Sequence, residues 1–269
     1  MLSLEKQLLY ILMRKPNIEV SELLGIYRGR DYSAQSIRNA ISRLKKSGYI
    51  DHRGRAYFLT ASGSHFIKAF QDKLLLKDHD WNGSWQLVVY QIPEPLRRAR
   101  NTLRQELTDL GYGQLFQSVF ISPHDQSLSV RQIFSDLNIQ PYVNIFSGHF
   151  IYGDVKTRMQ EIWDLKKIES LYVDFISWTK DKSVSWVKQE SIDSWDAFFH
   201  VLELGERFGA ILLKDPMLPA QFLPMNWPGG EAWKTYRLLF TKLAASVADN
   251  QEIIKLIKDD VGEKLVKPV

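Results

Sequence analysis

The stretch SAQSIRNAISRLKKSGYIDHRGRAYFLT, residues 33–60, decides how the N-terminal part of the chain folds. Its first half has apolar residues at helical spacing, between a serine suited to cap a helix and a glycine suited to end one. Its second half has two short strand-forming runs, separated by a basic turn that contains Gly54. We therefore expect a helix over 33–47 and a β-hairpin over 49–59, with its turn at 52–55.

Helical patterns also lie on both sides of this stretch. Leucine and isoleucine recur at helical spacing near the N-terminus until Pro16 ends the pattern. The order of three helices, a hairpin and a fourth helix predicts a winged helix-turn-helix domain. We place its end at residue 79, because the polar segment 77–84 lacks any periodicity. In chain order, the expected helices are 2–14, a second from Glu19 or Ser21 to about 26, a third at 33–47, and a fourth that Thr60 caps and that runs through Leu74.

The positive charge of the chain is concentrated in this first segment. Residues 1–79 carry fourteen Lys and Arg against seven Asp and Glu, a net charge of +7. The remaining residues have a net charge of −3, which together gives the +4 of the whole chain. A localised positive charge is expected of a module that meets phosphates, although a solvated basic face without a partner has the same composition.

The expected helix over 33–47 has one apolar and one polar face. Arg can bond guanine O6 and N7 together, Asn and Gln can bond adenine in the same way, and Ser and Lys suit phosphates. We therefore predict that this face binds double-stranded DNA, helped by two arginines of the hairpin; the alternative is a winged helix that acts as a protein-interaction adaptor. The predicted DNA-binding residues are Ser33, Gln35, Ser36, Arg38, Asn39, Ser42, Arg43, Lys45, Lys46, Arg53 and Arg55.

The remainder of the chain predicts an α+β protein with two further domains. Residues 80–154 alternate strand and helix in an order that suggests a ferredoxin-like sheet, which we expect to serve in dimerisation. Residues 155–269 are expected to be mostly helical, with a rigid break at 222–230. The middle elements are expected at 85–92, 95–110, 115–122, 129–137 and 142–147, in the order strand, helix, strand, helix, strand.

Signals of catalysis and of cofactor binding are weak. The absence of cysteine excludes disulfides and thiolate metal sites, and the six histidines have no partner at helical spacing. The Gly111-Tyr112-Gly113 sequence lacks the third glycine of a nucleotide fingerprint, and Pro123-His124-Asp125 fits a turn better than an acid–base pair. We therefore expect a protein that is not an enzyme and has neither metal nor cofactor.

Tryptophan is concentrated in the last third of the chain, and two interpretations stay open. The rings can fill the core, or some of them can line a pocket for an aromatic effector, with bases nearby for its phosphates. The sequence does not choose between these. The candidate bases are Lys156, Arg158, Lys166 and Lys167.

The N-terminus and the hydropathy pattern predict a cytoplasmic protein. Polar and acidic residues come too early for a signal peptide, and no apolar run approaches the length of a membrane span.

Several stretches, in this order along the chain, resemble PaaX-type transcriptional repressors. They are Trp81–Val88, Ile92–Arg100, Leu110–Gly113, Ile121–His124, Leu223-Pro224 and Trp227–Gly229. The resemblance implies a dimeric bacterial repressor of aromatic-acid catabolism genes, commonly those of phenylacetate, which an aryl-CoA thioester releases from its operator. Such a dimer would place two recognition helices in successive major grooves of an imperfect palindrome.

The middle domain of such repressors is also similar to small ferredoxin-like nucleases of CRISPR adaptation. In those nucleases the first strand typically ends in Asp within a Tyr-Asp-Ile context, where this chain has Tyr90-Gln91-Ile92. An amide cannot replace a carboxylate as a magnesium ligand of matching charge, and Glu94 is expected to start a helix instead. A metal-dependent nuclease is therefore the enzyme alternative, and Gln91 argues against it.

Overall fold

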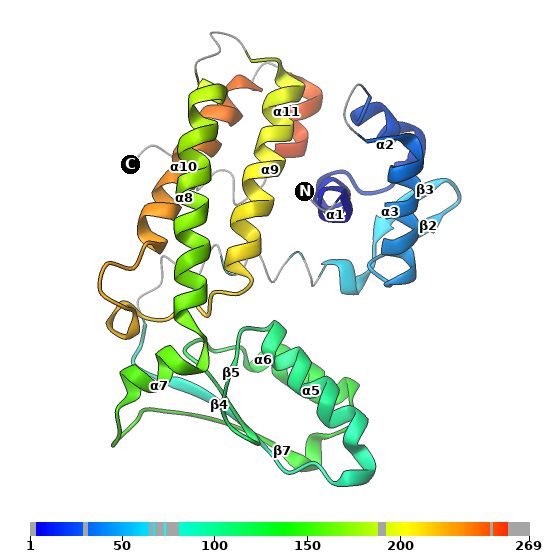
Figure 1. The fold of residues 1–269 in the computed structure, drawn as a ribbon. Helices are drawn as coiled ribbons and strands as arrows, with labels where there is room; N and C mark the ends of the chain where they lie inside the picture. The colour runs from blue at the N-terminus through cyan, green and yellow to red at the C-terminus, as the bar shows by residue number, and fades with distance from the viewer. Residues whose placement is uncertain are drawn as a thin grey trace. The chain divides into compact units, whose positions relative to one another are not determined.

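The computed structural model of the chain describes residues 4–28, 32–64, 67, 73, 81–187, 192–247 and 250–257. Helices predominate, and two small antiparallel sheets complete an α+β chain, as expected (Figure 1). The chain forms two compact units, and each unit is built from stretches that are separate in the sequence. The first unit comprises Met1–Asp72, Asp174–Ala210 and Gly230–Val269, and the second comprises Lys73–Val173 and Ile211–Gly229.

The elements predicted for the N-terminal segment are present in the predicted order. A short strand at 18–19, which the sequence did not suggest, adds to the hairpin and gives a three-stranded sheet of order β1-β3-β2. The hairpin turn is tighter than expected: the strands pair as far as Arg53 and Ala56, and Gly54 begins a two-residue turn with φ of +62°. The elements are α1 (Leu4–Arg14), β1 (Ile18–Glu19), α2 (Val20–Ile26), α3 (Ala34–Lys46), β2 (Ile50–Arg53) and β3 (Ala56–Leu59).

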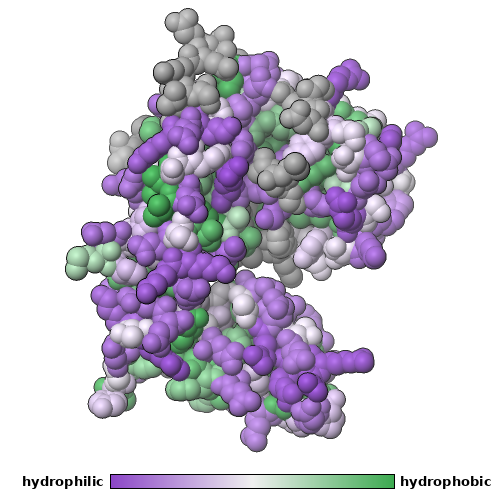
Figure 2. Space-filling model, in the orientation of Figure 1, coloured by the Kyte–Doolittle hydropathy of each residue, from purple (hydrophilic) through white to green (hydrophobic). Residues whose placement is uncertain are grey.

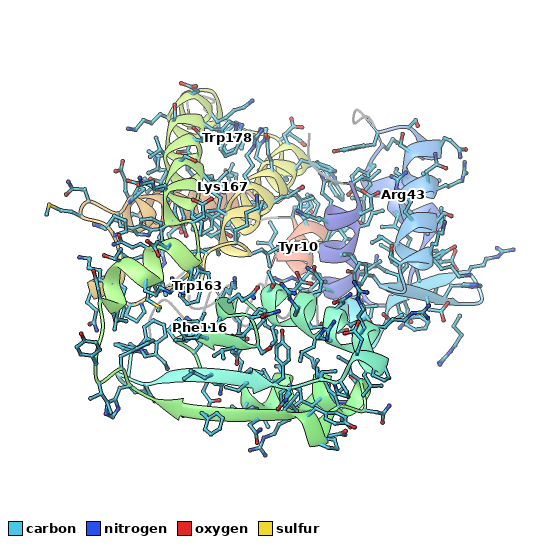
Figure 3. All side chains as sticks on the ribbon, turned by 60° about the horizontal axis from the view of Figure 1, so that its bottom comes forward. Tyr10, Arg43, Phe116, Trp163, Lys167 and Trp178 are labelled. Carbon is cyan, nitrogen blue, oxygen red and sulfur yellow. The ribbon has the colours of Figure 1, made fainter. Side chains whose placement is uncertain are left out.

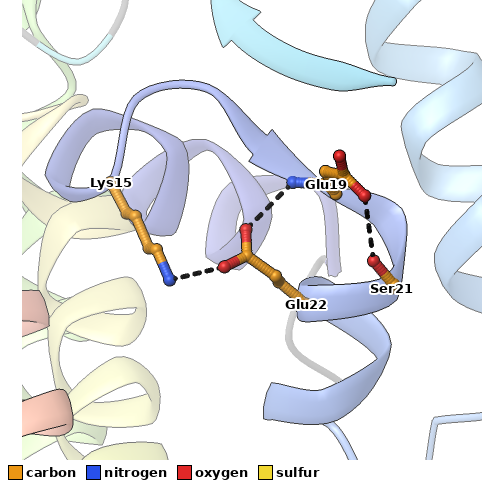
Figure 4. Close-up of polar contacts among 4 residues, drawn as sticks. All are labelled: Lys15, Glu19, Ser21 and Glu22. Atoms are coloured by element: carbon orange, nitrogen blue, oxygen red, sulfur yellow. Dashed lines mark hydrogen bonds and ion pairs between the residues drawn. The ribbon is translucent and has the colours of Figure 1, made fainter.

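Side-chain caps define where the helices of this segment begin. Glu19, and not Ser21, is the N-cap of α2: its side chain accepts from the third helical N–H, and its own N–H donates to Glu22 Oε2 at 3.1 Å (Figure 4). Ser21 Oγ donates to the Glu19 carboxylate instead. Lys15 bonds the other Glu22 oxygen at 2.9 Å, and this hydrogen bond is the main cause that lowers the pKa of Glu22.

The fourth helix is described only in part. Thr60 Oγ1 accepts from Gly63 N–H at 3.2 Å, which confirms the predicted cap. Residues 61–64, 67 and 73 are helical, while the rest of the predicted helix up to Leu74 and most of the polar boundary at 77–84 lie outside the described residues.

A four-stranded sheet forms the centre of the second unit. All neighbouring strands are antiparallel in the order β5-β6-β4-β7. The single strand expected over 115–122 is wrong: the chain reverses at 117–118, and Phe116 pairs with Val119. The elements are β4 (Trp85–Tyr90), η1 (Glu94–Leu96), α5 (Arg97–Asp109), β5 (Gly113–Phe116), β6 (Val119–Ser122), α6 (Ser127–Asp136), η2 (Gln140–Tyr142) and β7 (Val143–Gly148).

Apolar side chains from α5, α6 and one face of the sheet form the core of this unit. Val88 and Leu103 are fully buried in it, as is Ile139. The apolar spacing predicted for 95–110 is confirmed at Leu103 and Leu107, since both face the sheet.

The chain after residue 154 is mostly helical, as predicted. The two long helices α9 and α10 are separated by residues 213–228, which contain one short 3-10 turn at 220–222, so α10 begins within the break predicted at 222–230. Phe208 of α9 stacks on Tyr236 of α10, with ring centroids 4.5 Å apart. The elements are α7 (Val155–Ile162), α8 (Leu165–Val187), α9 (Ser194–Leu212), η3 (Ala220–Phe222), α10 (Gly229–Ser246) and α11 (Gln251–Ile257).

Candidate nucleic-acid interface

The polar face of α3 is exposed, while its apolar face is buried, as the spacing predicted. Ile37, Ala40, Ile41 and Leu44 are all buried. Gln35, Arg38, Asn39 and Ser42 are exposed along the other face, and they span two turns of the helix. This helix therefore presents donors and acceptors to the solvent on a rigid scaffold.

Two side chains of this face are bonded to each other. Gln35 Nε2 donates to Asn39 Oδ1 at 2.9 Å. The bond fixes which end of the Asn39 amide is the acceptor, and it leaves Nδ2 as a donor directed elsewhere. An Asn amide with both groups oriented is suited to the paired acceptor and donor of an adenine edge.

Other residues of the predicted set divide into free and engaged side chains. Lys45 and Lys46 are exposed near the end of α3, and neither they nor Arg38 bond another described side chain. Arg43 Nε lies 2.5 Å from Glu5 Oε1 of α1, a contact that the sequence pattern did not reveal. Part of the Arg43 guanidinium is therefore paired within the protein.

The two predicted serines at the start of α3 serve the helix itself. Ser36 N–H donates to Ser33 Oγ at 3.0 Å, and the two hydroxyls lie 2.9 Å apart. Ser33 is thus the N-cap that the sequence predicted, and Ser36 is half-buried. Both are positioned near the helix N-terminus, where backbone N–H groups favour an anion.

The hairpin adds two exposed arginines, Arg53 and Arg55, next to the turn. His52 Nδ1 lies 3.1 Å from the Gly54 carbonyl oxygen, and its ring is 5.7 Å from that of Tyr57. Residues 33–60 hold six Lys and Arg against one acidic residue, Asp51. The helix face and the hairpin therefore form a surface of positive charge that suits a polyanion.

A buried polar group that the sequence did not reveal ties the connection between α2 and α3 to α1. Gln7 of α1 is 3% exposed, and it accepts from Tyr27 Oη at 3.1 Å and donates to Tyr32 Oη at 3.2 Å. The rings of Tyr27 and Tyr32 meet edge to face with centroids 5.5 Å apart, and burial raises the pKa of Tyr27. These contacts tie the two ends of the α2–α3 connection to α1; the only signal in the sequence is a glutamine on the apolar face of that helix.

The second unit shows no assembled metal-binding group within its described residues. Gln91 is exposed where β4 ends, and Glu94 pairs with Arg100 at 3.1 Å and with Arg97 at 3.8 Å. Across the described part of the chain no three His, Asp or Glu side chains gather as a metal site would require. Glu94 is the first residue of the 3-10 turn that precedes α5. The sequence predicted it at the start of a helix, where the helix dipole favours a carboxylate.

The histidines differ in what surrounds them. His124 Nε2 lies 3.2 Å from the Pro216 oxygen and 3.1 Å from that of Met217, and burial lowers the pKa of its ring. Asp125 bonds Ser127 instead of His124, so the predicted turn is confirmed. His65 and His79 lie outside the described residues.

The tryptophans whose role the sequence did not decide lie in both units. In the second unit, Trp85 is buried and stacks at 6.4 Å on Trp163, whose Nε1 donates to the Gly111 carbonyl. In the first unit, Arg207 lies 4.3 Å over the Trp178 ring. Figure 3 shows Trp163 just before the start of α8 and Trp178 further along that helix.

The four candidate bases predicted from the sequence are exposed. Arg158 donates to the Leu115 carbonyl at 3.0 Å and lies over the Phe116 ring, while Lys156, Lys166 and Lys167 face solvent. Hydrophilic side chains cover most of the surface in view in Figure 2. Among the described helices, none has the length and apolar character to cross a membrane.

Comparison with known proteins gives matches along most of the chain. A family model described as the PaaX protein central Cas2-like domain matches residues 78–160, and one described as the PaaX-like protein C-terminal domain matches residues 163–252. The chain is similar to the transcriptional repressor PaaX of Escherichia coli strain K12, with 24% identity over 231 residues, 81% of this chain and 72% of that protein. An uncharacterized protein, Rv0674 from Mycobacterium tuberculosis, has a similar fold, with a TM-score of 0.56 and 20% identity over 91% of this chain and 97% of its own.

Proposed function

The chain belongs to the PaaX family, and from this premise we propose that it is a transcriptional regulator, specifically a repressor that binds double-stranded operator DNA. The similar protein of Escherichia coli carries the name of a transcriptional repressor. The observation that carries the proposal is the face of α3, where Arg38 and the bonded pair Gln35 and Asn39 are exposed over a buried apolar face.

Residues 4–59 act as a winged helix-turn-helix in this proposal. α2 and α3 are the two helices of the motif, and α3 enters the major groove with Arg38 and Asn39 at base edges. Lys45 and Lys46 then meet phosphates, and the hairpin is the wing, with Arg53 and Arg55 at the backbone or minor groove. Order, caps and exposure of these elements support the assignment.

The middle of the chain acts as a ferredoxin-like dimerisation domain in this proposal, and its free edge is β7. The order β5-β6-β4-β7 makes β5 and β7 the sheet edges, and on β5 the Leu115 carbonyl already accepts a hydrogen bond from Arg158. From residue 137 to 153 the sequence has no Asp, Glu, Lys or Arg, while Phe146 is 56% and Ile151 95% exposed. Free edges usually carry charges that prevent pairing, so this edge suits antiparallel pairing with the β7 of a second copy.

An aryl-CoA thioester is the proposed effector, and phenylacetate-type catabolism genes are the proposed targets. The support is the resemblance to the family and the aromatic residues of the last third, among them Trp163 and Trp178. The effector must prefer a state that binds DNA weakly, because equal affinity for both states shifts nothing. The proposed location is the cytoplasm, where both the operator and acyl-CoA compounds are found.

Binding of genomic DNA fragments at several salt concentrations tests the function. We expect one or a few fragments to bind at least 10³-fold more tightly than random DNA, with affinity for both falling as salt rises. Equal binding of all fragments at every salt concentration would contradict the repressor and favour a protein-interaction adaptor. Cleavage of labelled DNA with magnesium or manganese would instead favour the nuclease alternative.

A further inference from the structure

The first helix of the chain is covered on every side. None of its residues from Leu4 to Arg14 is exposed, whereas a helix at the surface of a globular protein has a solvated polar face. α1 contacts α3 and β3 of the N-terminal segment, and it also contacts α11 near the end of the chain. All of these elements belong to the first unit. The packing of α1 therefore joins the N-terminal segment to the C-terminal helices within that unit.

α10 and α11 supply the cover that the N-terminal segment does not. Ile253 and Leu256 of α11 are buried, and Tyr10 lies where α1 and α11 meet (Figure 3). The Arg14 guanidinium lies 5.0 Å over the Tyr10 ring. Burial, and next to it the nearby Tyr10, raise the pKa of Tyr236 of α10. Side chains of α1 thus take part in the packing of the last two long helical segments.

α9 reaches the connection between α2 and α3. The Phe199 ring of α9 lies 5.3 Å from the Tyr27 ring, measured between centroids. Glu206 comes seven positions after Phe199 and therefore lies on the same side of α9, two turns further along. Burial, then Tyr32, then the charge of Glu206 raise the pKa of Tyr27. One side of α9 is therefore directed at Tyr27.

Tyr27 connects this side of α9 to the start of α3. Its ring meets that of Tyr32 edge to face at 5.5 Å, and its hydroxyl donates to Gln7. Tyr32 directly precedes Ser33, the N-cap of α3. A continuous series of side-chain contacts thus runs from Phe199 through Tyr27 to the N-terminus of α3. Closely packed side chains transmit a displacement, because there is little free volume to absorb it.

We propose that α9 and α11 set the position of α3, with Phe199 and Tyr27 as the positioning residues, and thereby regulate its affinity for DNA. A compound that displaces α9 then changes the fit of α3 to the major groove without touching the DNA-binding face. The effect on DNA rests on the proposed function, whereas the coupling of α9 to α3 does not.

Hydrogen exchange in the full chain tests the coupling without DNA. The Ile37 amide donates to the Ser33 carbonyl at 3.1 Å in the first turn of α3, and the Tyr49 amide donates to the Leu44 carbonyl at 3.0 Å beyond its other end. In Phe199→Ala we expect the Ile37 amide to exchange about tenfold faster, with the Tyr49 amide close to its rate in the parent protein. Equal acceleration of both amides would indicate general destabilisation and overturn the proposal.

DNA binding tests the consequence for recognition. Phe199→Ala should lower the ratio of the affinities for preferred and random DNA about tenfold. The dependence of affinity on salt should not change, because no charge that meets a phosphate is lost. Phe222→Ala is the matched control, since it truncates another half-buried ring, which packs on Trp85 in the second unit. This variant should keep the parent values of both the affinity ratio and the Ile37 exchange rate.

The outcomes separate the coupling from the proposed function. Where Phe199→Ala does not fold by circular dichroism, Phe199→Leu decides, because it removes the ring and keeps an apolar side chain. A folded variant with the Ile37 exchange rate of the parent would overturn the proposal, as would faster exchange with an unchanged affinity ratio. Faster Ile37 exchange, in a protein whose parent binds all DNA equally, would support the coupling and contradict the proposed function alone.

Discussion

Among single residues of α3, we expect some exposed side chains to recognise DNA bases and others to stabilise the protein. Arg38 bonds no other described side chain, whereas Arg43, one turn further, bonds Glu5. We expect Arg38→Ala to weaken binding to the preferred DNA site by ~1–3 kcal/mol while binding to random DNA changes little. Titrating both DNAs at fixed salt measures the difference.

Arg43→Ala is the matched control on the same helix. The Arg43 side chain is 61% exposed, so removal of its pair with Glu5 should lower the free energy of unfolding by about 1 kcal/mol. Discrimination between the preferred site and random DNA should stay near the parent value. If Arg43→Ala removes discrimination and Arg38→Ala does not, the assignment of the reading face is wrong.

Gln7 carries a prediction about stability rather than recognition. Gln7→Leu removes the acceptor of the Tyr27 hydroxyl, which lies on a buried residue, and it also removes the hydrogen bond to Tyr32 Oη. An unpaired buried polar group costs ~1–3 kcal/mol, so the free energy of unfolding should fall by that amount in urea. In Tyr27→Phe the additional effect of Gln7→Leu should be smaller; full additivity of the two changes would contradict the coupling.

At the scale of elements, the hairpin is expected to supply charge without sequence discrimination. Arg53 and Arg55 stand on either side of Gly54, both exposed. Replacing both with Ala should weaken binding to preferred and random DNA alike, because bonds to phosphates carry no sequence information. The slope of log affinity against log salt should fall by ~1 for each phosphate that the hairpin no longer neutralises.

An effect confined to the preferred DNA site would show instead that the hairpin arginines contact bases. Lys156→Ala, which removes a positive charge from the exposed surface of α7, is the control for general electrostatics. Its salt slope should equal that of the parent protein.

Elements with strong local signals could be predicted from the sequence, and those set by distant partners could not. The Ser33 cap, the buried face of α3 and the hairpin were predicted because periodicity and capping chemistry are local. The split of 115–122 into two strands was missed because the turn at 117–118 has no glycine or proline. The bonds of Arg43 to Glu5 and of Gln7 to Tyr27 were missed since each joins residues at least twenty positions apart.

At the scale of the whole molecule, segments of the last third belong to both compact units. Residues 174–210 and 230–269 join the N-terminal segment, whereas 211–229 joins the sheet. A division by sequence composition cannot reveal such an exchange, since the composition of a segment does not name the segment that it packs against. The division into three consecutive domains, 1–79, 80–154 and 155–269, stays a prediction, which the folding of fragments cut at 79 and 154 can test.

Dimerisation is the property of the whole molecule on which operator recognition depends in our proposal. Asn144 lies on β7, is exposed, and sits in the uncharged run of 137–153. Asn144→Lys places like charges near each other across an isologous edge-to-edge pairing, and like charges in facing positions of a sheet are destabilising. The expected result is a dimer of the parent protein and a monomer of the variant, measured by light scattering after size exclusion.

A charge placed away from β7 should leave the dimer intact, and the interface must extend beyond the β7 edge itself. Gln132→Lys adds the same charge at an exposed position of α6, and this variant should remain a dimer. A stable dimer buries about 800 Å² on each partner, so the β7 edge must be joined by neighbouring apolar residues, of which Ile151 and Tyr152 are 95% exposed. A dimer that survives Asn144→Lys would place the interface elsewhere, and a monomeric parent protein, free and on DNA, would contradict recognition of two half-sites by one assembly.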